Sequence, residues 1–170
     1  AAWAGAGGPC DVDACRESAL RLLDAADRPS GALRDRLIDK GYDDETVAAV
    51  VDRLIEVGLV DDESYAQSAV RYCVGRLMGY RGAVMELARK GVDRPLAERV
   101  CDEARMSGVF EDAAWELGRR SAAKTQGMDP KVRKRRFWSS GGRKGTTPNL
   151  RAVAHELLIR MNYLNELSLR

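Results

Sequence analysis

The sequence contains a single histidine, His155, and its four cysteines form no Cys-x-x-C pair. A structural zinc site needs four closely placed ligands, and the common nucleophilic sites pair a Ser or Cys with a neighbouring base. His155 has no such partner in a recognisable motif. The sequence therefore predicts no metal site and no cofactor, and we expect a protein that is not an enzyme.

Aromatic residues make up only 6% of the chain, and no apolar run approaches the roughly 20 residues that cross a bilayer. Ala, Leu, Arg and Val dominate instead, which favours helix over sheet. The stretch from Ala1 to Pro9 is rich in glycine and lacks the basic and apolar regions of a signal peptide. We expect a disordered leader over residues 1–13, a cytoplasmic location and reduced thiols, with Cys73 and Cys101 acting as small hydrophobic side chains.

Nearly every segment after the leader shows helical periodicity, with Ser30 and Asp43 expected as N-caps and Lys40-Gly41 as a helix end. A shift of 50 residues places Leu33, Leu37, Lys40, Gly41, Asp43, Val50 and Asp52 on Ala83, Leu87, Lys90, Gly91, Asp93, Val100 and Asp102. A third Lys-Gly pair, Lys144-Gly145, follows Lys90-Gly91 after 54 residues, with a Gly141-Gly142 loop inserted before it.

This pattern predicts an all-α protein of nine helices in three tandem three-helix repeats, forming an elongated, curved, solenoid-like body. The predicted boundaries are residues 14–58, 61–107 and 110–170, the last repeat containing a basic insertion. Repeat proteins of this shape usually function by binding other molecules.

Two acidic triplets, Asp43-Asp44-Glu45 and Asp61-Asp62-Glu63, resemble cation ligands but stand at predicted helix starts. Carboxylates there accept hydrogen bonds from the first N–H groups, so capping is the favoured interpretation. The segment from Gly141 to Thr147 has the order Lys-Gly-Thr and follows no strand, so it does not match a phosphate-binding P-loop.

Charge is graded along the chain. Residues 1–64 have 7 basic and 15 acidic side chains, residues 65–118 have 8 of each, and residues 119–170 have 13 basic and 3 acidic ones. The net charges are therefore −8, 0 and +10. Such asymmetry indicates that the two ends face different surroundings.

The most distinctive stretch runs from Lys131 to Trp138. It could face water while Phe137 and Trp138 fill a core, or it could bind an anionic partner, with Trp138 stacked on a base; we favour the partner. The candidate partner- or DNA-binding residues are Arg71, Arg76, Arg89, Lys90, Lys131, Arg133, Lys134, Arg135, Arg136, Trp138, Arg143 and Lys144.

The segment Gly58-Leu59-Val60-Asp61-Asp62-Glu63-Ser64-Tyr65-Ala66 resembles the hallmark stretch of the RecX family, regulators of the bacterial RecA recombinase. The resemblance includes a Lys-Gly-aromatic turn before it, Lys40-Gly41-Tyr42, and a second turn after it, Arg89-Lys90-Gly91-Val92, with Gly79-Tyr80 between them. It covers residues 16–105 and, more weakly, the chain through residue 163. The Gly141-Gly142 loop and the basic run depart from the usual third unit.

The resemblance implies a regulator of recombination, DNA repair and the SOS response. Such a protein lies in the groove of the RecA–DNA filament and restrains filament growth, ATPase activity and strand exchange. We expect a monomer whose basic third makes a weak direct contact with DNA. Two alternatives remain. One is a direct DNA-binding protein of tandem helix-turn-helix-like units, and the other is a small hydrolase or phosphoryl-transfer enzyme, which the motifs disfavour.

Overall fold

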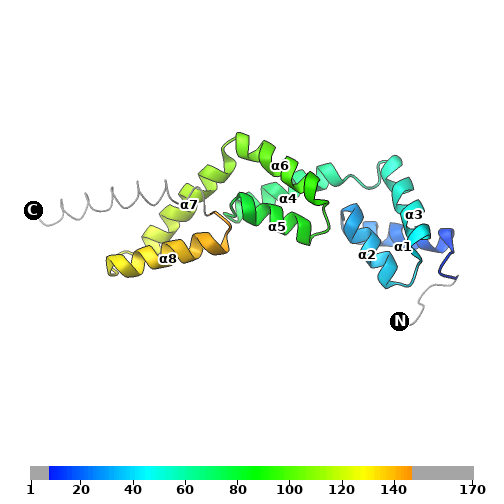
Figure 1. The fold of residues 1–170 in the computed structure, drawn as a ribbon, viewed down its shortest axis with the longest axis horizontal. Coiled ribbons are helices and arrows are strands. Elements are labelled where there is room, and N and C mark those ends of the chain that lie inside the picture. The colour runs from blue at the N-terminus through cyan, green and yellow to red at the C-terminus, as the bar shows by residue number, and fades with distance from the viewer. Residues whose placement is uncertain (1–7, 147–170) are drawn as a thin grey trace, which may run out of the picture. The chain divides into compact units, whose positions relative to one another are not determined.

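The chain is described by a computed structural model over residues 8–146, which contains eight helices and no strand (Figure 1). The all-helical prediction is confirmed for this part. The predicted ninth helix and most of the predicted leader lie outside the described residues. The helices are α1 (Val12–Ala25), α2 (Ser30–Asp39), α3 (Asp44–Glu56), α4 (Asp62–Gly75), α5 (Tyr80–Arg89), α6 (Arg94–Met106), α7 (Val109–Lys124) and α8 (Pro130–Arg143).

The 50-residue repeat is present in the helix boundaries. Helices α1, α2 and α3 have 14, 10 and 13 residues, and α4, α5 and α6 have the same three lengths. Each helix of the second set begins 50 residues after its counterpart. The spacing read from the sequence therefore corresponds to a repeated three-helix unit.

The Lys-Gly turns that close the second helix of each repeat have the same geometry. Gly41 and Gly91 have φ angles of 97° and 92°, a conformation that glycine adopts without steric cost. The N–H after each glycine then reaches back to the helix: Tyr42 donates to Leu37 O at 3.3 Å and Val92 to Leu87 O at 3.1 Å. Thr146 donates to Gly141 O at 3.0 Å in the same way, so α8 is the third copy of this helix.

Two expectations about these helices are wrong. Gly141 and Gly142 are not a loop but belong to the last turn of α8, where Gly141 is buried, so the tertiary context overrides the low helix propensity of glycine. Ser30 is not an N-cap but the first residue of α2, whose N-cap is Pro29. Helix α1 also begins at Val12, inside the span predicted as leader.

The chain forms two compact units. Unit 1 contains residues 1–69 and 87–97, and unit 2 contains residues 70–86 and 98–170, each described here within residues 8–146. The boundary between the two units runs through the second repeat. One reason lies within unit 1, where the Gly91 turn packs against the start of α2: a Cβ built on Gly31 would meet the carbonyl oxygen of Gly91.

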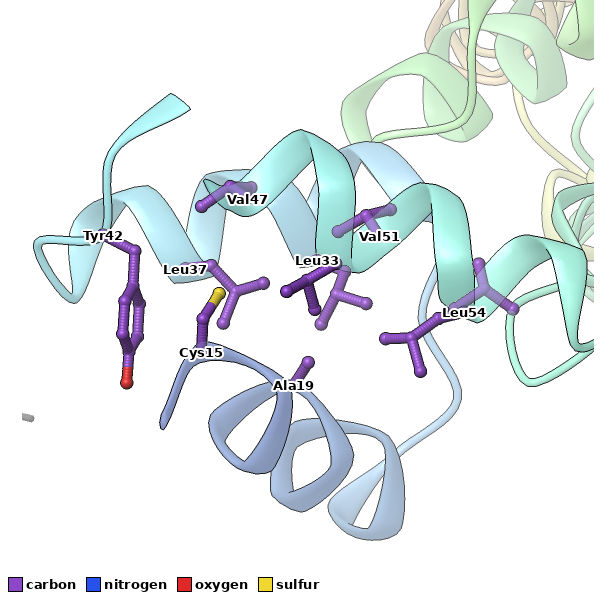
Figure 2. Close-up of a cluster of buried hydrophobic side chains, with 10 residues drawn as sticks. Cys15, Ala19, Leu33, Leu37, Tyr42, Val47, Val51 and Leu54 are labelled. Carbon is purple, nitrogen blue, oxygen red and sulfur yellow. The ribbon is translucent and has the colours of Figure 1, made fainter. Parts of the chain in front are cut away.

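The core of unit 1 gathers one face from each of α1, α2 and α3 (Figure 2). Cys15 and Ala19 from α1 face Leu33 and Leu37 from α2, and Val47, Val51 and Leu54 of α3 close the cluster. Tyr42 borders this core and donates its hydroxyl hydrogen to Ala14 O at 2.9 Å. The amphipathic spacing of three helices thus produces one small core.

In unit 2, α7 and α8 lie side by side (Figure 1). Phe110 is fully buried and meets Tyr80 edge to face, with ring centroids 6.1 Å apart. Cys73 and Cys101 are both 0% exposed and unbridged, which confirms their role as small core side chains.

No helix within residues 8–146 is long and apolar enough to span a bilayer.

The acidic triplets act at helix starts, as predicted. Asp43 accepts a hydrogen bond from Thr46 N at 3.0 Å and Asp61 accepts one from Ser64 N at 2.9 Å. Asp62 instead reaches the start of α2, where it accepts from Ser30 N at 2.6 Å and from Ser30 Oγ at 2.5 Å. The hallmark segment therefore joins two helices that belong to successive repeats.

Candidate anion-binding cleft

A concave space of about 700 Å³ opens in unit 2 between the end of α4, the second half of α7 and the second half of α8. Half of its fourteen lining residues are cations and none is acidic. We call this space the basic cleft, and its cations are Arg76, Arg120, Lys124, Arg135, Arg136, Arg143 and Lys144. Leu77 and Leu117 add apolar surface, and Ser121, Thr125, Ser139 and Ser140 add hydroxyl groups.

Helical spacing explains how α7 and α8 present these side chains. On α8, Arg136, Ser139, Ser140 and Arg143 follow at i, i+3, i+4 and i+7, which places them on one face. On α7, Arg120 and Lys124 are separated by four residues. Because α7 and α8 pack together, the two basic faces border the same space.

Arg76 enters the cleft from a different part of the chain. Helix α4 ends at Gly75, and Leu77 then adopts a left-handed conformation with a φ of 58°. Met78 N donates to Cys73 O at 3.0 Å, which closes the turn in the manner usual for a glycine at this position. A leucine is conformationally unfavourable there, so contacts from elsewhere in the fold are needed to hold the turn.

Lys144 fastens this turn to the end of α8. Its Nζ donates to Arg76 O at 2.9 Å, and its own carbonyl oxygen accepts from Gly79 N at 2.7 Å. These two hydrogen bonds of Lys144, one to Arg76 and one from Gly79, hold the turn beside the α8 cations, although Arg76 and Lys144 are 68 residues apart in sequence.

The charge of the cleft is little compensated. Within residues 8–146, Arg120 is the one lining cation that forms an ion pair with a carboxylate, at 2.7 Å from Glu116. Hydrogen bonds from Arg120 and Arg119 lower the pKa of Glu116 below its ordinary value. Arg143 donates to Ser139 Oγ at 2.8 Å, a neutral partner. The remaining positive charge favours an anionic ligand.

The cleft brings together five of the predicted binding residues, Arg76, Arg135, Arg136, Arg143 and Lys144. Lys131, Arg133 and Lys134 lie earlier on α8, and Arg71 lies on α4. Arg89 is the last residue of α5 and Lys90 follows it, both in unit 1. Trp138 is half-buried and meets Phe137 edge to face at 6.0 Å. The binding roles of all these residues stay predictions.

Two cations of the cleft, Arg120 and Lys124, were not predicted as binding residues, although their i, i+4 spacing in the basic third could have indicated them.

Tyr72 was not predicted as a functional residue either. It stands one helical turn before Arg76, whose guanidinium carbon lies 5.5 Å from the centre of the Tyr72 ring. An arginine four residues after a tyrosine on a helix is a signal for such a contact.

Residues 15–54 match the family model described as RecX, first three-helix domain. A regulatory protein RecX of Thermobifida fusca is 37% identical over 159 residues, which cover 90% of this chain and 84% of the relative. Another from Mycobacterium sp. (strain JLS) is 49% identical over 77 residues, or 44% of this chain and 41% of the relative. The crystal structure of RecX from Lactobacillus salivarius shares the fold, with a TM-score of 0.76 at 20% identity over 88% of this chain and 97% of that one.

Proposed function

Because this chain belongs to the RecX family of regulatory proteins, we propose that it regulates recombination and the SOS response through the RecA filament on DNA. In this proposal it binds in the filament groove and restrains filament growth, ATP hydrolysis and strand exchange, and it catalyses no reaction itself. It would act in the cytoplasm, where its partner assembles on DNA.

The basic cleft is the observation that carries the proposal beyond the family name. Seven cations around one space, with one ion pair to a carboxylate among the described residues, form a surface for phosphates or for an acidic protein face. A repeat protein can add several weak contacts along a filament, because each contact raises the effective concentration of the next one.

The direct test follows ATP hydrolysis by RecA on single-stranded DNA while this protein is titrated in. We expect the rate to fall as the protein approaches the amount of RecA, and filaments seen by electron microscopy to become shorter. Unchanged hydrolysis and unchanged filament length at equimolar protein would contradict the proposal.

Two matched double variants on α8 test the role of the cleft. Arg135→Glu with Arg136→Glu reverses two lining charges, while Lys131→Glu with Lys134→Glu reverses two exposed charges of the same helix outside the lining. We expect the first pair to need at least about tenfold more protein for half-inhibition, because each reversal replaces attraction with repulsion in a concave site. The second pair should shift half-inhibition much less. Equal shifts would show that only the total charge matters.

The alternative of a direct DNA-binding protein makes a different prediction. A protein that binds DNA through each of its tandem repeats should be basic in every repeat, yet residues 1–64 have a net charge of −8. Nanomolar binding to bare duplex DNA at physiological salt, in the absence of RecA, would favour that alternative.

A further inference from the structure

Tyr72 presents an aromatic ring to solvent beside the basic cleft. The residue is 53% exposed and lies on α4, one turn before the lining residue Arg76. Arg76 donates from its guanidinium to the Tyr72 hydroxyl at 3.0 Å, and its guanidinium carbon lies over the ring, 5.5 Å from the ring centre. Both residues belong to unit 2, as does the whole cleft. The ring is thereby held in place next to a concentration of positive charge.

An exposed ring beside a basic groove is the combination that single-stranded nucleic acids require. Cations along the groove neutralise successive phosphates, and the ring offers a flat apolar surface for a base. Arginine in contact with the ring can extend that surface, since a guanidinium plane also stacks on bases.

We propose that Tyr72 and the basic cleft bind single-stranded DNA, with one unpaired base stacked on the Tyr72 ring and the adjoining phosphates held by the cleft cations. This inference rests on the proposed function and deepens it, because it assigns the DNA strand of the filament as the ligand of this site. Arg76 acts at the junction, since it contacts the ring and lines the cleft.

The geometry favours a single strand over the other anionic ligands. In a duplex the faces of the bases are covered by their neighbours, so Tyr72 would have no base to contact. An acidic peptide could bind the cations but offers no planar group to stack on the ring. A free nucleotide bears its charge on one short phosphate chain, whereas the cations of this cleft come from two helices, α7 and α8, and from the turns after α4 and α8.

The test measures binding by fluorescence anisotropy, without RecA, to three labelled ligands of equal length: a mixed-sequence single strand, its duplex, and an abasic single strand. The wild-type protein is compared with Tyr72→Ala, Tyr72→Phe and Met85→Ala. Met85 is a suitable control because it is 73% exposed, lies in unit 2 and does not line the cleft. Thermal unfolding followed by circular dichroism confirms that each variant is folded.

We expect micromolar binding of the single strand at low salt and a loss of about 5- to 150-fold for Tyr72→Ala, the range seen when a stacking aromatic is removed. Tyr72→Phe and Met85→Ala should bind within about twofold of wild type. Tyr72→Ala should leave duplex binding and abasic binding unchanged, because those ligands present no open base to the ring. Tyr72→Ala should also leave the salt dependence of single-strand binding unchanged, since the phosphate contacts remain.

Several outcomes would overturn the inference: no effect of Tyr72→Ala on the single strand, an equal loss on the abasic strand, or binding of a polyglutamate peptide in place of DNA. These outcomes are separable from failure of the proposed function. If wild-type protein restrains RecA while Tyr72→Ala binds single strands normally, this inference fails and the function stands. If single-strand binding depends on Tyr72 while RecA is unaffected, the function fails and this inference stands.

Discussion

At the scale of single residues, neighbouring carboxylates of one motif have different tasks. Asp61 caps its own helix, while Asp62 holds the backbone N–H and the hydroxyl of Ser30 at the start of α2. Ser30 is 8% exposed, so water cannot easily replace the carboxylate. The hallmark of the sequence is therefore a structural connection between repeats.

Replacing Asp62 should destabilise the protein more than replacing an acidic residue that only faces solvent. We expect Asp62→Ala to lower the free energy of unfolding by about 1–3 kcal/mol, because two hydrogen bonds to a charged group are lost and Ser30 keeps unsatisfied donors. Asp44→Ala, at an exposed position in the first turn of α3, should cost less than about 0.5 kcal/mol. Urea unfolding followed by circular dichroism compares the two, and equal losses would argue against a special role for Asp62.

At the scale of elements, the start of one helix packs closely on the glycine turn of the next repeat. In unit 1, Gly31 on α2 meets the Gly91 turn, and in unit 2, Gly82 on α5 meets the Gly145 turn. A side chain at either helix position would collide with backbone atoms, which cannot move aside as the end of a flexible side chain can. The same contact therefore recurs in both units.

Two glycine-to-alanine substitutions in helices should change the free energy of unfolding in opposite directions. Alanine is better than glycine in a helix by about 1 kcal/mol, so Gly75→Ala, where no atom lies within 4 Å of the new Cβ, should be neutral or stabilising. Gly31→Ala gains the same helix propensity but places its Cβ against the Gly91 carbonyl, so we expect a net loss of about 1–3 kcal/mol. Thermal and urea unfolding measure both, and a stabilised Gly31→Ala would mean that this junction is loosely packed.

At the scale of the whole molecule, similar three-helix units differ in charge. Residues 1–64 have a net charge of −8 and residues 119–170 have +10, although the Lys-Gly turns of both regions have the same hydrogen bonds. The shared features build the fold, and the cleft is formed where the basic residues concentrate. Function therefore follows from the differences between the copies.

Global stability should fall in alkaline solution, because each unit buries a thiol. Burial raises the pKa of Cys15 in unit 1 from 9.0 to about 11, and that of Cys101 in unit 2 to about 12. Below pH 9 both thiols are protonated in the folded and unfolded states, so they add no pH dependence. Above pH 9 the unfolded thiols ionise while the folded ones keep their protons, so stability decreases as pH rises toward 11 and 12.

Urea unfolding between pH 8 and pH 10.5 tests this expectation. Each buried thiol should contribute a slope of about −1.4 kcal/mol per pH unit within its window. Cys101→Ala should reduce the slope, whatever its effect on stability at pH 8. An unchanged slope in that variant would show that other groups, such as the tyrosines, cause the alkaline loss.

Much of the fold was predictable because its signals are local. Asp43 and Asp129 cap helices, and Gly41 and Gly91 end them, through contacts within a few residues. The helical Gly141-Gly142 turn was not predictable in this way, because two adjacent glycines give no local signal for a helix. Binding residues were predicted from charge alone, and this included side chains such as Lys131 that do not line the cleft.

The sequence by itself determined the helices, their 50-residue period and the graded charge, because caps, glycines and periodicity act between close neighbours. Only the tertiary structure decided which cations share one space. Arg76 meets Lys144 across 68 residues of sequence, and Asp62 meets Ser30 across 32. Such pairings depend on how the helices pack. Helix packing depends on the fit between whole helix faces, and no short segment of sequence specifies that fit.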